Sequence, residues 1–228
     1  MLITCKNVSF AYEGNTVIRN INFSVESGDY LCIAGENGCG KTTLLKGILG
    51  LIKPSQGFIM STVTAGQIGY LPQQSPVQKD FPAGVYEVVL SGRFCMRGLR
   101  PFYSRADKEI AMENLERLGI ADLRNRCYRE LSGGQQQRVL IARALCAAQK
   151  VIALDEPAAG LDPLATAGVY NLLEKIARKT GITVIMVSHD IENAAKYANR
   201  ILHLQQGQFF FGTAEEYIHS DIGKRFLI

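Results

Sequence analysis

The sequence predicts an α/β fold: a core on a parallel sheet, interrupted by a helical segment, with an antiparallel strand layer at its N-terminal end. Three observations support this prediction. An apolar strand, a glycine-rich loop and a helix follow one another over residues 30–49. Two apolar, β-branched strands, Val151–Leu154 and Thr183–Val187, read as parallel strands buried on both faces. Between residues 84 and 148 apolar and charged residues instead interleave at helical spacing.

The N-terminal layer is predicted from two β-prone stretches, Leu2–Phe10 and Val17–Val25, which are separated by a turn-like run at residues 13–15. Tyr30–Ala34 is the strand that leads into the glycine loop. The helix after that loop is expected to run from residue 41 to about residue 49, where Gly50 ends it.

Within the helical segment the spacing is clearest over Glu109–Leu118 and from Gly134 to Ala148. Ala165–Thr180 is a further helix between the last two predicted strands. The 228 residues are therefore expected to form a single domain, with residues 1–83 and 149–228 as its core and residues 84–148 as a helical subdomain.

Composition places the chain among globular proteins, with 47% hydrophobic and 20% charged residues. The formal charge of +4 is spread along the chain, which favours a mixed-sign surface over a nucleic-acid patch. The chain has no apolar run of about 18 residues and no signal-peptide pattern at its start. Six scattered cysteines and three separated histidines give neither a disulfide framework nor metal-ligand spacing, so we expect a soluble intracellular protein.

Residues 35–42 read Gly-Glu-Asn-Gly-Cys-Gly-Lys-Thr, between a predicted strand and a predicted helix. The glycines allow backbone N–H groups to wrap around phosphates at a helix N-terminus. Lys41 supplies a positive charge for the β- and γ-phosphates, and Thr42 offers a hydroxyl to a bridging Mg²⁺. The pattern predicts a site for a nucleoside triphosphate.

A pair of acids, Asp155 and Glu156, ends the apolar strand that starts at Val151. The carboxyl ends of parallel strands are where ligands bind in such sheets. Asp155 is expected to orient Mg²⁺, and Glu156 to polarise the attacking water as a general base.

Residues 131–135 read Leu-Ser-Gly-Gly-Gln and open another helix, whose N–H groups and Ser132 hydroxyl form a second anion-binding end. Together with the phosphate loop, this segment makes the chain resemble the ATP-hydrolysing subunit of an ABC (ATP-binding cassette) transporter, a P-loop NTPase, over nearly its whole length. In that family the segment closes over the ATP of a second subunit. The resemblance therefore implies a working pair of chains, with a homodimer as the expected form.

The resemblance assigns further roles. Tyr12 resembles the aromatic residue that stacks on adenine, and Gln73 the glutamine that contacts Mg²⁺ and senses the membrane partner, although its neighbour Gln74 stays open. His189 resembles the switch histidine that contacts the γ-phosphate, and Asp162 lies in the loop that couples the two sites. The full predicted set is Tyr12, Gly35, Glu36, Asn37, Gly38, Cys39, Gly40, Lys41, Thr42, Thr43, Gln73, Ser132, Gly133, Gly134, Gln135 and Asp162 for nucleotide, Glu156, His189 and Lys41 for catalysis, and Thr42, Gln73 and Asp155 for Mg²⁺.

The segment at residues 75–93 resembles ATPases of importers for zinc and manganese, and more loosely those for iron chelates. Two interpretations of its apolar positions stay open: Phe81 and Val85 dock a helix of the membrane subunit, with Arg93 as a charged partner, or they belong to the ordinary packing of the helical segment. Cys39 replaces the small residue common in the loop, and two interpretations stay open: it is tolerated for its size, or the positive setting beside Lys41 makes it a reactive thiolate.

The resemblance implies an ATPase with ATP and Mg²⁺ that works at the cytoplasmic face of the membrane, with separate permease subunits and an extracytoplasmic substrate-binding protein. Alternatives are an importer ATPase for another solute, a soluble ABC protein acting on ribosomes or DNA, and a regulator without turnover. The last is disfavoured by Glu156 and His189, and the ribosome or DNA reading by the single cassette and the lack of long heptad arms or a basic tract.

Overall fold

The structure is a computed structural model that describes residues 1–12, 15–73, 82–98, 100–205 and 208–227. Its centre is a six-stranded sheet in the order β5-β6-β7-β3-β8-β9. The strands are β3 (Tyr30–Gly35), β5 (Ile68–Leu71), β6 (Val151–Asp155), β7 (Thr183–Val187), β8 (Arg200–Gln205) and β9 (Gln208–Thr213). All neighbouring pairs are parallel except β8 and β9, which pair antiparallel.

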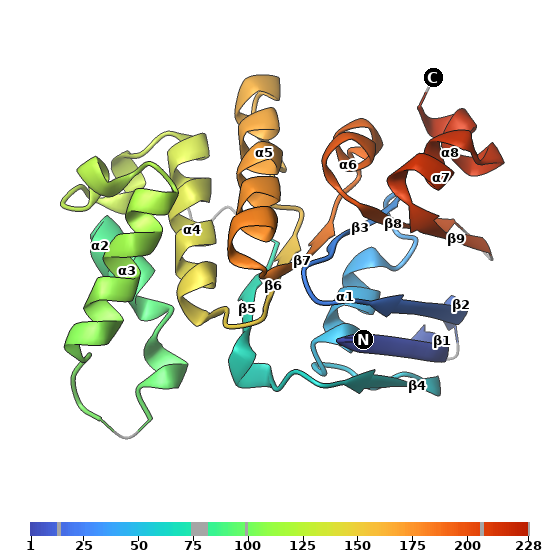
Figure 1. The fold of residues 1–228 in the computed structure, drawn as a ribbon, viewed down its shortest axis with the longest axis horizontal. Helices are drawn as coiled ribbons and strands as arrows, with labels where there is room; N and C mark the ends of the chain where they lie inside the picture. The colour runs from blue at the N-terminus through green and yellow to red at the C-terminus, as the bar shows by residue number, and fades with distance from the viewer. Residues whose placement is uncertain (13–14, 74–81, 99, 206–207, 228) are drawn as a thin grey trace.

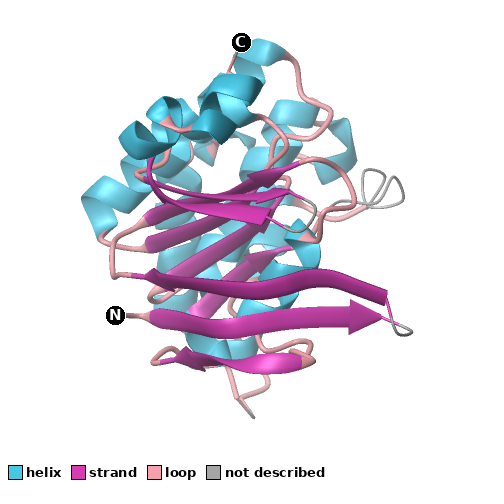
Figure 2. Cartoon of the chain, turned by 90° about the vertical axis from the view of Figure 1, so that its right-hand side faces the viewer, coloured by secondary structure: helices cyan, strands magenta, loops and turns pink. Residues whose placement is uncertain are grey.

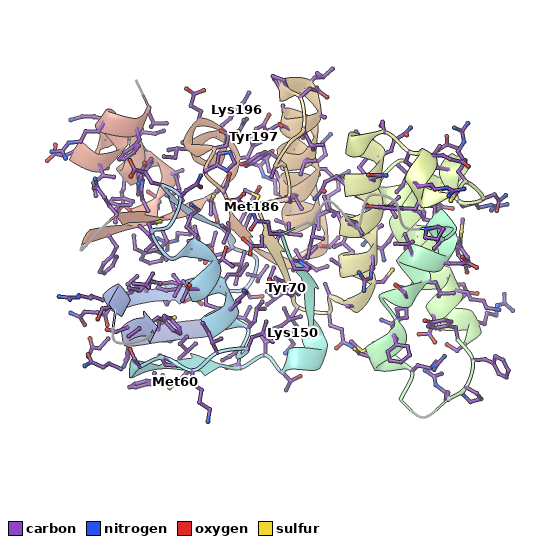
Figure 3. The ribbon with its side chains drawn as sticks, turned by 180° about the vertical axis from the view of Figure 1, so that it is seen from behind. Met60, Tyr70, Lys150, Met186, Lys196 and Tyr197 are labelled. Carbon is purple, nitrogen blue, oxygen red and sulfur yellow. The ribbon has the colours of Figure 1, made fainter. Side chains whose placement is uncertain are left out.

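A second, three-stranded antiparallel sheet has the order β2-β1-β4, formed by β1 (Ile3–Tyr12), β2 (Asn15–Val25) and β4 (Gln56–Ser61). It lies across the six-stranded sheet at one side of the molecule, as Figures 1 and 2 show. The helix α1 (Lys41–Ile48) packs in the same apolar cluster as the inner faces of both sheets. Figure 3 shows Met60 at the outer margin of this layer and Met186 in the interior, in agreement with their exposures of 52% and 0%.

The helices of the inserted segment are α2 (Val85–Ser91), α3 (Arg105–Arg117) and α4 (Gly133–Ala147), which lie together at the opposite end from the antiparallel sheet (Figure 1). They are followed by α5 (Pro163–Thr180), α6 (Ile191–Tyr197), α7 (Ala214–His219) and α8 (Asp221–Phe226). One apolar cluster contains residues of α2, α3 and α4 together with Ile152 and Met186 of the sheet. The segment therefore packs on the sheet instead of enclosing a separate core.

The predicted fold class is confirmed: a parallel sheet, an antiparallel layer and an inserted helical segment are all present. The division of the chain at residues 84 and 148 stays a prediction. Two short strands, β4 and β5, the β8–β9 hairpin and the C-terminal helices were not predicted, because these segments are short or carry no regular apolar period.

Candidate nucleotide site

The loop between β3 and α1 can be formed only with glycine at two of its positions. Gly35 has φ 139°, and a Cβ there would lie 2.2 Å from the carbonyl oxygen of Leu204 in β8. Gly40, which caps α1, has φ 98°, and a Cβ would meet the side chain of Ile18 at 2.7 Å. Since L side chains rarely adopt such backbone angles, these glycines set the tight path of the loop.

The Lys41 side chain lies inside this loop. Only 5% of the residue is exposed, and its ammonium donates hydrogen bonds to the carbonyl oxygens of Gly35 and Glu36, both at 2.8 Å. A cleft of about 270 Å³ opens beside it. The residues that line the cleft are Val17, Asn37, Gly38, Gly40, Lys41, Thr42, Thr43, Gln73 and Glu156. A positive charge and helix N–H groups facing one cleft suit a polyphosphate.

Asp155 and Thr42 meet at the carboxyl end of β6, where the Thr42 hydroxyl donates to Oδ1 of Asp155 at 3.0 Å. The pKa of Asp155 is raised above its ordinary value, chiefly by burial and also by the charge of Glu156. The hydrogen bond from Thr42 and the charges of Lys46 and Lys41 lower this pKa, but they do not outweigh burial. A buried carboxylate beside a hydroxyl is a set of hard oxygen donors, which is the kind that Mg²⁺ prefers.

Glu156 stands at the junction of three loops. Its backbone is left-handed, with φ 50°, and its N–H donates to the carbonyl oxygen of Val187 at 3.0 Å. The carboxylate accepts a hydrogen bond from the Gln73 amide at 3.2 Å and lies 3.7 Å from Nδ1 of His189. A glutamate held in an unfavourable backbone conformation among polar groups is the kind of local strain found at functional sites.

The N-terminal end of α4 is capped by its own side chains. The Ser132 hydroxyl accepts from the N–H of Gln135 at 3.4 Å, and the N–H of Ser132 donates to the Gln135 side chain at 3.0 Å. A Cβ atom added at Gly133 or Gly134 would make an ordinary van der Waals contact with Leu161 or Ala165. Ser132 and Gly133 are exposed, and this end of the helix lies beside the start of α5. Asp162 caps α5 by accepting a hydrogen bond from the Ala165 N–H at 3.0 Å.

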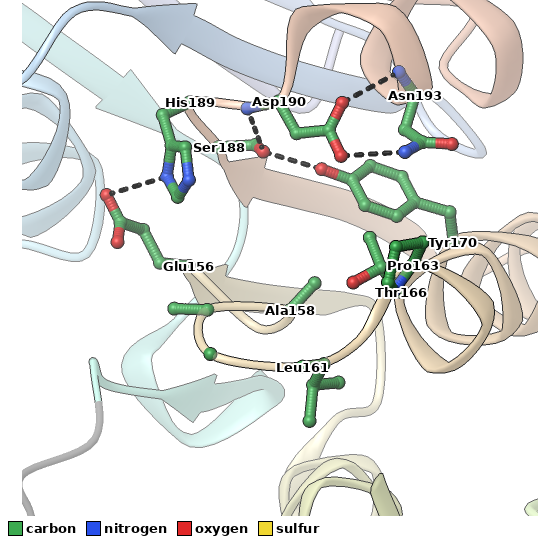
Figure 4. A pocket seen from close by; sticks show the side chains of 12 residues that line it. Glu156, Ala158, Leu161, Pro163, Thr166, Tyr170, Ser188, His189, Asp190 and Asn193 are labelled. Atoms are coloured by element: carbon green, nitrogen blue, oxygen red, sulfur yellow. Dashed lines mark hydrogen bonds and ion pairs between the residues drawn. The ribbon is translucent and has the colours of Figure 1, made fainter.

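A second pocket, of about 300 Å³, lies between the loop after β6 and the loop after β7. Figure 4 shows Glu156 and His189 on one side of it and Tyr170 of α5 on the other. Tyr170 and Ser188 share a hydrogen bond of 2.5 Å between their hydroxyls. Sequence reasoning missed both residues and also Val17; the position of Ser188 directly before His189 was the available signal for the first pair.

Comparison with known proteins agrees with this geometry. The family model described as ABC transporter matches residues 18–159, which is more than half of the chain. The chain belongs to the ABC transporter family. It is 38% identical to the zinc uptake system ATP-binding protein ZurA of Listeria innocua, over 96% of this chain and 88% of the relative. It is 39% identical to the manganese transport system ATP-binding protein MntB of Bacillus subtilis, over 92% of this chain and 85% of that protein.

Solved structures give the same result. A metal-chelate type ABC transporter in an inward-facing conformation matches with a TM-score of 0.88 and 33% identity, over 99% of this chain and 88% of that one. CbiO1 of Clostridium perfringens, described as part of the ABC transporter complex cbiONQ, matches with a TM-score of 0.86 and 28% identity, over 98% and 93%. As an ABC ATPase the chain binds and hydrolyses ATP for a transporter. None of the described helices is both long and apolar enough to cross a bilayer.

Of the two interpretations of Cys39, the structure favours a residue tolerated for its size over a reactive thiolate. Burial raises the pKa of the thiol, and this effect outweighs the charge of Lys41. The side chain packs with Ile18 and Leu204 at the rear of the loop, in a small pocket between β2 and β8. An apolar environment favours the neutral thiol.

The predicted docking role of Val85 toward a membrane subunit is wrong. Val85 is completely buried, with 0% exposure, so it cannot contact a partner. Arg93 is held inside the helical segment, where its guanidinium donates to Asp107 at 3.0 Å and to the carbonyl oxygen of Cys146 at 2.8 Å. Phe81 and Gln74, as well as the side chain of Tyr12, lie outside the described residues.

Proposed function

We propose that the chain is the ATPase subunit of an importer for divalent metal ions such as Zn²⁺ or Mn²⁺. The observation that carries the proposal is similarity of 35–39% identity, over nearly the whole chain, to ATP-binding proteins of zinc and manganese transport systems. The cargo would be carried by other subunits, and this chain would supply the energy. No cluster of three or more His, Cys, Asp or Glu side chains that could hold a metal ion is present in the described part of the chain.

Each part of the cleft has a proposed role in hydrolysis. Lys41 and the N–H groups of the loop hold the β- and γ-phosphates. Glu156, which lines the same cleft, accepts the proton of the attacking water. His189, 3.7 Å from that carboxylate, contacts the γ-phosphate. Asn37, Gly38 and Thr43 line the binding cleft, while Gly35 and Gly40 set its shape.

Mg²⁺ is the proposed metal cofactor, and the oxygen donors at the end of β6 fit it. Thr42, Asp155 and Gln73 would hold the ion, directly or through water. When bound, the ion neutralises charge on the β- and γ-phosphates.

The active form is proposed to be a head-to-tail homodimer. Ser132, Gly133, Gly134 and Gln135 present an exposed helix N-terminus, whose N–H groups and positive dipole end suit a phosphate. It would complete the ATP site of the second chain. Asp162, at the start of α5 beside this helix, would couple the two sites.

The remaining partners are proposed to be permease subunits in separate chains and an extracytoplasmic substrate-binding protein, with this chain at the cytoplasmic face of the membrane. Co-purification with a membrane protein tests this part of the proposal. Association with ribosomes or DNA instead would support the soluble alternative, although the cleft would still hydrolyse ATP.

Deletion of the gene tests the cargo. Uptake of radioactive Zn²⁺ or Mn²⁺ is expected to fall, and surplus metal is expected to restore growth. A Glu156→Gln copy of the gene should fail to restore uptake, while the wild-type copy restores it. Unchanged accumulation of both metals, together with loss of an iron chelate or an organic solute, would contradict the metal assignment and leave the ATPase intact.

A further inference from the structure

Two linked hydrogen bonds lie next to His189, one buried and one partly buried, and no proposed step of hydrolysis uses them. Tyr170 of α5 is 1% exposed, and its hydroxyl lies 2.5 Å from the hydroxyl oxygen of Ser188. The same Ser188 oxygen accepts a hydrogen bond from the N–H of Asp190 at 2.9 Å. Figure 4 shows these bonds running from the Tyr170 hydroxyl through the Ser188 side chain to the backbone N–H of Asp190.

His189 itself has few contacts that would fix its position. Its side chain is 57% exposed, and its Nδ1 lies 3.7 Å from a carboxylate oxygen of Glu156, which is longer than a hydrogen bond. The position of the ring therefore depends on the backbone of its two neighbours. Ser188 is fixed to β3 through its N–H, which donates to the carbonyl oxygen of Ile33 at 3.1 Å, and to α5 through its hydroxyl.

Tyr170 connects this backbone to the middle of α5. The helix begins at Pro163, directly after the loop that lines the same pocket as Glu156 and His189. The ring of Tyr170 packs against Tyr197 of α6, with centroids 5.9 Å apart, so the side chain is held from both sides. A buried hydroxyl without a partner is costly, which keeps the bond to Ser188 in place.

We propose that Tyr170 is a positioning residue for hydrolysis: through Ser188, its hydroxyl holds the loop that places His189 beside Glu156. A shift of α5 would move this loop, which makes Tyr170 a link between the 158–162 loop and His189. The inference rests on the proposed role of His189 in the reaction.

The test is Tyr170→Phe in the full-length chain, assayed for ATP hydrolysis. The kcat is expected to fall by about 10-fold, because a small misplacement of a reacting group is costly. The KM for ATP should stay within about two-fold, since Lys41 and its loop are untouched. Tyr217→Phe is the matched control: Tyr217 is equally buried, and its hydroxyl lies 2.6 Å from His203, outside both pockets. Both variants should lose a similar few degrees of Tm, about 2–4 °C, but only the first should lose kcat.

A double variant that combines Tyr170→Phe with His189→Ala separates failure of the Tyr170 inference from failure of the proposed role of His189. If Tyr170 acts through His189, Tyr170→Phe adds no further loss of kcat in the His189→Ala background. Unchanged kcat in Tyr170→Phe, or an equal loss in Tyr217→Phe, would overturn this inference while loss of activity in His189→Ala keeps the proposed role of His189. An His189→Ala enzyme at full rate would overturn both.

Discussion

The phosphate loop and the N-terminal end of α4 offer an anion the same chemistry in different surroundings. In the loop, the buried Lys41 and the half-buried Thr42 line the same cleft as Glu156. At the end of α4, the Ser132 and Gln135 side chains are bonded to each other's backbone, and Ser132 is exposed. The difference supports the proposal that the loop binds nucleotide by itself, whereas the α4 end would act as a lid over the site of another chain.

The largest effect is expected at the catalytic end of the loop. Glu156→Gln should bind ATP normally, because Lys41 and the glycine backbone are unchanged, and should hydrolyse it at least about 10²-fold more slowly, the scale of a lost general base. Single-turnover hydrolysis and equilibrium binding of ATP measure the two quantities. The same variant should accumulate as an ATP-dependent dimer.

Glu215→Gln, an exposed acid in the first turn of α7, is the control and should keep the wild-type rate. Near-normal turnover by Glu156→Gln would remove Glu156 from the role of base and would leave the loop as a site for binding only.

The next effect tests whether the α4 end works on a second chain. Ser132→Arg should reduce hydrolysis by roughly 10- to 100-fold, the scale of lost transition-state stabilisation, while one chain still binds ATP. Lys41→Ala should instead lose ATP binding. Mixing the two inactive variants should recover activity, because one of the two sites in a mixed dimer then has an intact loop and an intact lid.

Thr213→Arg is the matched control for the lost helix cap. Thr213 caps α7 with the same reciprocal pair of bonds, to Glu216. Its substitution should lower the free energy of unfolding by about 1 kcal/mol and leave hydrolysis unchanged. If mixing restores nothing, or if Ser132→Arg weakens ATP binding by the isolated chain, the two-chain site is wrong.

The sequence was sufficient to predict some of these site residues and contacts but not others. The phosphate loop and the cap at Ser132 were predicted because each depends on residues close together in the chain. The orientation of Arg93 was not, because its partners are Asp107 on α3 and a carbonyl at residue 146, at the end of α4. Likewise, Val85 and Tyr170 are residue types that any apolar helix face can carry. The packing of the helices on the sheet decides what each of them contacts, and the sequence does not show this packing.

A smaller effect is expected from a buried histidine behind the loop. His203 of β8 pairs with Ala34, the residue before Gly35, and is bonded to Tyr217 at 2.6 Å. Burial, and to a lesser degree the charge of Lys41, lowers the pKa of His203 to about 4. The ordinary pKa of histidine is about 6.5. At a pH between that value and about 4, His203 therefore binds a proton in the unfolded chain but not in the folded chain.

The free energy of unfolding should therefore fall as the pH decreases through that window, by about 2 kcal/mol at pH 5 from this residue. Urea denaturation at pH 7.5 and pH 5 measures the change. His203→Gln should lose this part of the pH dependence, whereas His219→Gln, at an exposed position, should keep it. An unchanged pH dependence in His203→Gln would contradict the low pKa.

The smallest effect is expected at Cys39, where the rear of the loop differs from its open side. Because burial raises the pKa of this thiol, a maleimide at pH 7 should react with it at least about 10-fold more slowly than with the exposed Cys95. Cys39→Ser should keep kcat within about two-fold, since the side chain packs behind the loop and faces away from the cleft. Mass spectrometry of labelled peptides gives both rates. Rapid labelling of Cys39 that inactivates the enzyme, and that ATP prevents, would instead show that the thiol reaches the phosphate side of the loop as a thiolate.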